Sequence, residues 1–129
     1  MSKTILIVDD EERLVSLVEA YLMQEGYRVL TASNGRQALE VTREEQPDLI
    51  VLDVMMPEMD GLEATRVIVD RWSQQERPSV VAMTANVMEG DREITAEAGM
   101  DDYVAKPIRV EELIGALSRV TPISEKGDV

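Results

Sequence analysis

Polar side chains that could take part in chemistry follow four short apolar runs of this sequence. The residues at these four ends are Asp9 with Asp10, Asp53, Thr84 and Lys106. If the runs are parallel strands of one sheet, their carboxyl ends meet at one edge, where open α/β sheets bind their ligands. Three carboxylates, a hydroxyl and an ammonium group would then share one site. This pattern favours a functional constellation over four unrelated strand ends.

The three carboxylates of this constellation indicate a metal site. Clustered carboxylates repel one another unless a cation neutralises them. The chain contains no histidine and no cysteine, so the ligands must be oxygen atoms, and these favour a hard cation, Mg²⁺ or Mn²⁺ in its place. A protein-bound Mg²⁺ commonly keeps a position for a phosphate oxygen. The cluster therefore predicts phosphoryl chemistry that depends on Mg²⁺.

A carboxylate can itself be the nucleophile for a phosphoryl group, and the product is an aspartyl phosphate. Such a transfer needs in-line approach and neutralisation of charge, which Mg²⁺, Lys106 and the hydroxyl of Thr84 could supply. Taken singly, Thr84 could be an ordinary strand-end threonine and Lys106 an ordinary solvated lysine. The absence of histidine and cysteine excludes the usual general base and thiolate catalysis.

The elements that must position these residues are strands and helices in alternation. Nearly continuous apolar strands are typical of a parallel sheet covered on both faces, which predicts a doubly wound (βα)5 fold. Helical periodicity lies between the runs and after the last one, with one helix ending at Gly26, one starting after Asn34-Gly35, one capped by Asp60 and one over residues 87–98. This pattern alone does not fix the strand order. The predicted strands are Thr4–Val8, Arg28–Thr31, Leu49–Leu52, Val80–Met83 and Tyr103–Ala105.

Length and charge limit the remaining possibilities. The chain has 129 residues, which suits one domain over residues 1–120, followed by a tail or the start of a linker over residues 121–129. A formal net charge of −13 argues against direct binding to nucleic acid or to an anionic membrane surface. No apolar run approaches the roughly 20 residues that span a bilayer, and the N-terminal MSKTILIVDD is not a signal peptide. A cytoplasmic location is the default expectation.

Four motifs in order now suggest a family. They are ILIVDDEE, LIVLDVMMPEMDG, VVAMTAN and AGMDDYVAKPI, and together they resemble the receiver domain of two-component response regulators, as in chemotaxis regulators, over residues 3–120. The second half is most similar to receivers of hybrid sensor histidine kinases. The resemblance implies the flavodoxin-like strand order 2-1-3-4-5. It leaves open whether the chain is a single-domain regulator or a fragment of a larger protein.

The resemblance implies a phosphoacceptor and a set of metal ligands. Asp53 would accept the phosphoryl group. Asp9 and Asp10 would hold Mg²⁺ together with Asp53, and Asp10 would be the more direct ligand of the first two. The backbone carbonyl of Met55 would complete the protein's share of the coordination.

The resemblance also implies a switch. Thr84 would hydrogen-bond the phosphoryl group and move toward it, and Lys106 would pair with its charge. Tyr103 would then swing inward, unless it is only a half-buried strand tyrosine. The bond between Lys106 and Pro107 is expected to be cis, which is accessible only before proline. The face built from the fourth helix, the fifth strand and the fifth helix would change its affinity for partners.

The resemblance places the chain among signalling domains, not enzymes acting on external substrates, although it would promote its own phosphorylation and slow dephosphorylation. Since the chain has no histidine, a sensor histidine kinase or a histidine phosphotransfer domain must supply the phosphoryl group. A downstream protein could read the result.

Three other functions share parts of this pattern. A flavin mononucleotide binder of the same fold would need a loop that cradles phosphate after the first strand, where the acidic residues 9–12 would repel it. A phosphatase of the haloacid dehalogenase type would want an acid two residues after Asp53, where the chain has Met55. A pseudo-receiver that only docks, without being phosphorylated, should lack a site residue, and none is missing.

Overall fold

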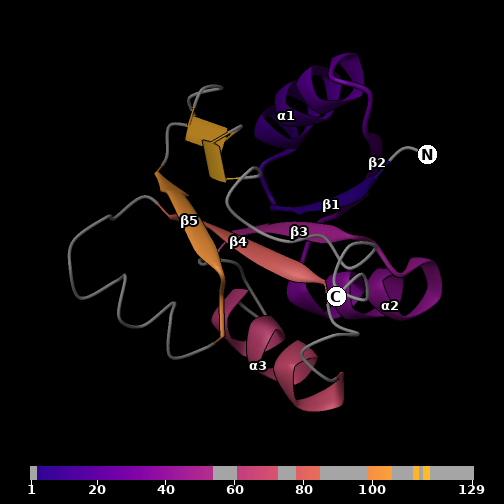
Figure 1. The fold of residues 1–129 in the computed structure, drawn as a ribbon, viewed down its shortest axis with the longest axis vertical. Coiled ribbons are helices and arrows are strands. Elements are labelled where there is room, and N and C mark those ends of the chain that lie inside the picture. Colours follow the sequence, from indigo (N-terminus) through magenta and orange to yellow (C-terminus); the bar gives the residue numbers. More distant parts are fainter. Residues whose placement is uncertain are drawn as a thin grey trace, which may run out of the picture.

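The fold is a five-stranded parallel sheet, and the computed structural model that shows it describes residues 3–53, 61–72, 78–84, 99–105, 112–113 and 115–116. The strand order is β2-β1-β3-β4-β5 (Figure 1). This order confirms the one that the family resemblance implied. The strands are β1 (Thr4–Val8), β2 (Arg28–Ala32), β3 (Leu49–Asp53), β4 (Ser79–Thr84) and β5 (Asp102–Ala105).

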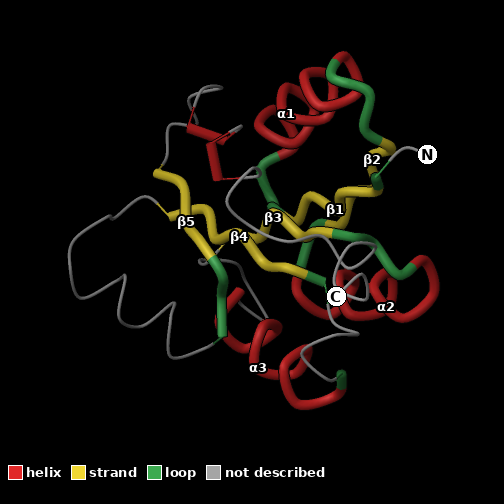
Figure 2. Tube along the Cα trace, in the orientation of Figure 1, coloured by secondary structure: helices red, strands yellow, loops and turns green. Residues whose placement is uncertain are grey.

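Helices cover both faces of the sheet, so the predicted doubly wound architecture is confirmed (Figure 2). On one face lies α1 (Glu12–Gln24), and the helical residues Leu113 and Ala116 belong to the same buried cluster. On the other face lie α2 (Gly35–Glu45) and α3 (Gly61–Arg71). The helix predicted over residues 87–98 and the cap predicted at Asp60 fall outside the described residues.

The two hydrophobic cores lie between these helices and the sheet. In β1, Ile5 and Ile7 face the α1 side, whereas Leu6 and Val8 face the α2 and α3 side. All four are at most 1% exposed. Because successive strand side chains point to opposite faces, a strand buried on both faces is apolar along most of its length. Each such side chain stabilises the fold by roughly 1.5–3 kcal/mol relative to its exposed form.

Local signals explain where two helices begin and end. The side chain of Asn34 accepts a hydrogen bond from the backbone N–H of Gln37 at 2.8 Å, and the Gln37 side chain accepts one from the Ser33 backbone N–H at 2.7 Å. This reciprocal pair resembles a capping box and starts α2. The predicted end of the first helix is confirmed, since Gly26 follows α1 with a φ of +95°, which glycine adopts at little cost.

The end of α3 leads to the amino edge of the sheet. Trp72 follows α3, and its backbone N–H donates to the carbonyl of Ile68 at 3.1 Å. Its half-buried ring packs against the cluster on the α2 and α3 side. Since α3 starts after the carboxyl end of β3 and leads to the beginning of β4, Trp72 lies near the amino ends of the strands. None of the helices in the described ranges has the length and apolar character that crossing a bilayer requires.

Candidate functional site

Three carboxylates meet at the carboxyl ends of β1 and β3. One carboxylate oxygen from each of Asp9, Asp10 and Asp53 lies within 4.8 Å of the other two. The sheet register explains this, because Val8 of β1 pairs with Leu52 of β3. The residues that follow this pair, Asp9 and Asp53, therefore lie at the same height along their strands. The parallel sheet brings these three residues together as the sequence indicated.

Asp53 is more deeply buried than we expected for a residue at the rim of the sheet. Its exposed fraction is 4%, and it is the last residue of β3, where we had ended the strand at Leu52. The reason is that β3 is central. Asp53 pairs with Met83 of β4 on one side and lies next to the end of β1 on the other. At the end of this central strand the carboxylate is therefore nearly as buried as Val51 and Leu52, which precede it.

The orientation of Asp9 is fixed by hydrogen bonds on both sides. Its backbone N–H donates to the carbonyl of Ala32 at 3.2 Å, and its Oδ1 accepts from the backbone N–H of Glu11 at 2.9 Å. Asp9 is 2% exposed, whereas Asp10 is exposed. Burying carboxylates is costly unless they are paired, hydrogen-bonded or bound to metal. Two buried carboxylates and one exposed carboxylate within reach of one another are an oxygen donor set that fits a hard divalent cation.

Of the other residues that were predicted for this site, the structure describes the backbone of Thr84. Thr84 is the last residue of β4 and lies one position beyond Met83, the partner of Asp53. Ala105 of β5 pairs with Thr84, so the chain leaves β5 towards Lys106 at the height of Thr84. Lys106, Pro107 and Met55 lie outside the described residues, as does the side chain of Thr84.

Tyr103, the predicted aromatic switch residue, is described. It lies in β5, pairs with Ala82 of β4, and is half-buried against the cluster on the α2 and α3 side. Its backbone N–H donates to Oδ1 of Asp102 at 2.8 Å. The half-buried position is compatible with either a switch or an ordinary strand tyrosine.

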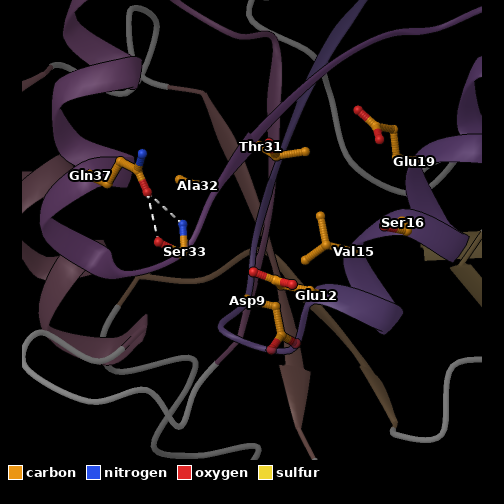
Figure 3. Close-up of a pocket in the computed structure, with 9 residues that line it drawn as sticks. All are labelled: Asp9, Glu12, Val15, Ser16, Glu19, Thr31, Ala32, Ser33 and Gln37. Carbon is orange, nitrogen blue, oxygen red and sulfur yellow. Dashed lines mark hydrogen bonds between the residues drawn. The ribbon is translucent and has the colours of Figure 1, made fainter.

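A polar cavity of about 380 Å³ opens beside Asp9, between α1 and the junction of β2 with α2 (Figure 3). Glu12 and Glu19 of α1 line it, as do Ser33 and Gln37 at the start of α2. The hydroxyl of Ser33 donates to the side-chain oxygen of Gln37 at 2.9 Å. Sequence reasoning did not find this cavity, since its lining residues come from separate elements, namely α1, β2, the start of α2 and the residue that follows β1. Asp9 therefore belongs both to the acidic cluster and to the wall of a cavity.

Comparison with known families shows what this chain is similar to. The family model described as "Response regulator receiver domain" matches residues 5–118. Among curated proteins, the alkaline phosphatase synthesis transcriptional regulatory protein PhoP of Bacillus subtilis is 40% identical over 125 residues. The match covers 97% of this chain and 51% of PhoP. The chain thus spans about half the length of this curated relative.

Solved structures give the same result. The chemotaxis protein CheY4 of Vibrio cholerae superposes with a TM-score of 0.86 at 29% identity, over 93% of this chain and 99% of that one. The receiver domain of the sensor histidine kinase PA1611 of Pseudomonas aeruginosa superposes with a TM-score of 0.81 at 38% identity, over 92% and 97%. In that domain a magnesium ion is coordinated in the active-site cleft.

Proposed function

Because this chain belongs to the response regulator receiver domain family of two-component signalling, we propose that it accepts a phosphoryl group on Asp53 from a phosphohistidine of a partner protein. The observation that carries this proposal is the meeting of Asp9, Asp10 and Asp53, each with a carboxylate oxygen within 4.8 Å of the others. Asp53 is the one that combines a central strand end with burial, which gives the acceptor a fixed position.

In the proposed transfer, a carboxylate oxygen of Asp53 attacks phosphorus in line with the bond that joins phosphorus to the donor imidazole nitrogen. The new P–O bond forms as the P–N bond breaks, and the nitrogen keeps the electron pair and takes up a proton. Mg²⁺, for which Mn²⁺ could substitute, would neutralise the phosphoryl oxygens. Asp9, Asp10 and Asp53 would hold this ion together with the backbone carbonyl of Met55.

Thr84 and Lys106 would complete the site from β4 and β5. The pairing of Thr84 with Ala105 supports this assignment, because β4 and β5 then end at the same height, one residue beyond Met83, the partner of Asp53. The hydroxyl of Thr84 would donate a hydrogen bond to the phosphoryl group, and the ammonium group of Lys106 would pair with its charge. Phosphorylation adds up to about two negative charges, which both groups would compensate.

The signal would leave the site through β5. We propose that Tyr103 turns inward when Thr84 moves, and that the face formed by the fourth helix, β5 and the fifth helix then changes its affinity for a downstream protein. Such a change is a shift between two existing conformations, driven by the better interactions that one of them makes with the phosphoryl group. Tyr103 lies in β5, pairs with Ala82 of β4, two residues before Thr84, and is half-buried, a position that is compatible with this role.

The proposed donor is a sensor histidine kinase or a histidine phosphotransfer domain, and the proposed location is the cytoplasm. The chain itself has no histidine. We place the receiver in residues 1–120 and treat residues 121–129 as a tail or linker. Similarity both to a transcriptional regulatory protein and to the receiver domain of a sensor histidine kinase supports either setting for this domain.

The test is phosphorylation by a small donor. The protein is incubated with Mg²⁺ and acetyl phosphate, and its intact mass is recorded. We expect one phosphoryl adduct that is lost with hydroxylamine and does not form after chelation of Mg²⁺. Asp53→Asn should form no adduct, whereas Asp70→Asn, which changes an exposed carboxylate on α3 in the same way, should behave as the wild type.

The pseudo-receiver alternative predicts a different outcome in the same experiment. A docking module that is never phosphorylated would show no adduct in the wild type, and no response to beryllofluoride, which mimics the phosphoryl group. That combination would overturn the proposed function. Retained binding to a histidine kinase in its absence would favour the docking module.

A further inference from the structure

Two aspartates at the edge of the sheet opposite to the site make the same pair of hydrogen bonds. Asp48 accepts from the Thr4 backbone N–H through Oδ2 at 2.8 Å, and its own N–H donates to the Thr4 carbonyl at 2.9 Å. Asp101 accepts from the Val80 backbone N–H through Oδ2 at 2.8 Å, and its N–H donates to the Val80 carbonyl at 2.8 Å. Each aspartate therefore holds one residue of another strand at two points.

The two aspartates also occupy equivalent places in the fold. Asp48 directly precedes β3 and holds the first residue of β1, whereas Asp101 directly precedes β5 and holds the second residue of β4. One aspartate thus joins β1 to β3, and the other joins β4 to β5. We call Asp48 and Asp101 the edge aspartates.

These two strand pairs are the ones whose other ends carry the site. The pair β1 and β3 ends in the three carboxylates, and the pair β4 and β5 ends in Thr84 and leads to Lys106. Neighbouring residues along a strand are about 3.3 Å apart, and a one-residue slip would turn every side chain to the opposite face. A fixed start of each pair therefore sets the relative height of the groups at its end.

We propose that the edge aspartates are positioning residues, each of which sets the geometry of one half of the phosphoryl site. Asp48 sets the metal half, formed by Asp9, Asp10 and Asp53. Asp101 sets the position of Thr84, the residue with which β4 ends. This inference rests on the proposed function, but its first half concerns metal binding alone and is measured without phosphoryl transfer.

The proposal predicts that Mg²⁺ binding and phosphoryl transfer can be impaired separately, each by a substitution of one edge aspartate. Asp48→Ala should weaken Mg²⁺ binding by about 10-fold, the lower end of what losing a residue that orients metal ligands costs. Asp101→Ala should leave the Mg²⁺ affinity unchanged and slow adduct formation at saturating Mg²⁺ by about 10-fold or more, as expected for a displaced reacting group. Mg²⁺ affinity is measured by calorimetry, and adduct formation by intact mass over time.

Asparagine at each position is the matched control. The amide keeps an oxygen that can accept the strand N–H, so Asp48→Asn and Asp101→Asn should recover most of the wild-type values. Amide hydrogen exchange checks the contact itself. The N–H of Thr4 should lose protection in Asp48→Ala only, and that of Val80 in Asp101→Ala only.

Several outcomes would overturn the inference. One is that Asp48→Ala and Asp101→Ala each lower both the Mg²⁺ affinity and the rate of adduct formation to the same extent. Another is a lower melting temperature with unchanged Mg²⁺ affinity and rate, which would make the edge aspartates purely structural. Where an alanine variant does not fold, glutamate at the same position keeps the acceptor but adds a methylene, and the same selective loss is expected. Failure of the wild type to form any adduct would instead overturn the proposed function, while the Mg²⁺ result for Asp48 would still decide the metal half.

Discussion

Asp9 and Asp53 lie side by side at the ends of two adjacent strands, and both carboxylates are almost fully buried, at 2% and 4% exposure. Neighbouring strands hold both backbones, so the attachment points of the two side chains stay close together. The protein therefore keeps two like charges close together in a place where water screens them poorly. A divalent cation would turn this repulsion into attraction.

Mg²⁺ should therefore stabilise the protein. A ligand that binds only the folded state adds about 2.7 kcal/mol to the free energy of unfolding at a concentration of 100 times its Kd. We expect the melting temperature to rise with Mg²⁺ concentration and to return to its starting value on chelation. An unchanged melting temperature up to millimolar Mg²⁺ would contradict a metal site at this cluster.

The variant Asp9→Asn should have a higher melting temperature than the wild type without Mg²⁺ and a lower one with Mg²⁺. Without Mg²⁺ it relieves the repulsion around Asp53, so its melting temperature should exceed that of the wild type. With Mg²⁺ it lacks a ligand, so most of the stabilisation should be lost. Melting curves recorded with and without chelator test both signs. Asp70→Asn, which changes an exposed carboxylate on α3, should leave the melting temperature unchanged both with and without chelator.

The variant Lys106→Met should separate phosphoryl transfer from metal binding. Methionine keeps an unbranched chain of similar length but removes the charge that would stabilise the phosphoryl oxygens. We expect the rate of adduct formation to fall by about 100-fold, as for the loss of one electrostatic contact to the transition state, with unchanged Mg²⁺ affinity. Arg71→Met, an exposed cation at the end of α3, is the matched control. A wild-type rate in Lys106→Met would remove Lys106 from the site.

The variant Gly99→Ala should be markedly less stable than Gly26→Ala. Both glycines have positive φ, +100° and +95°, but a Cβ at Gly99 would lie 2.5 Å from Cγ2 of Val69, whereas at Gly26 it would meet nothing within 4 Å. Both variants should lose about 1 kcal/mol or more from the backbone conformation, and Gly99→Ala should lose more by the clash. Urea unfolding measures both. Adding Val69→Ala should recover part of the difference, and no recovery would contradict the contact.

Much of the fold could be predicted because the inner strands contain nearly continuous apolar runs. Thr4–Val8 was predicted with the bounds that β1 has, and Gly26 indicated where the first helix ends. The second helix was expected after Asn34-Gly35, and α2 begins at Gly35 with Asn34 as its cap. The strand order could not be read from the pattern. Strands buried on both faces look alike in sequence, and only the family resemblance supplied the order 2-1-3-4-5, which the structure confirms.

The candidate site was predictable as a set of residues but not in its degree of burial. The alternation of strands and helices was enough to bring Asp9, Asp10 and Asp53 together. The burial of Asp53 depends on which strands flank β3, which is information about the strand order. The role of the edge aspartates was not predicted, because aspartate is common in loops and its presence before a strand does not indicate a function. The signal was present for Asp48, which directly precedes the apolar run of β3, but it was weaker for Asp101, because Asp102 stands between it and the apolar run of β5.

Trp72 is placed so that its fluorescence reports folding and not events at the carboxylate cluster. It is the only tryptophan in the chain, and its half-buried ring packs under α3 near the amino ends of the strands. The carboxylate cluster lies at the carboxyl ends. Intrinsic emission excited in the tryptophan band should therefore follow the loss of the layer formed by α2 and α3. This emission should not change when an ion or a phosphoryl group binds at the carboxyl ends of the strands.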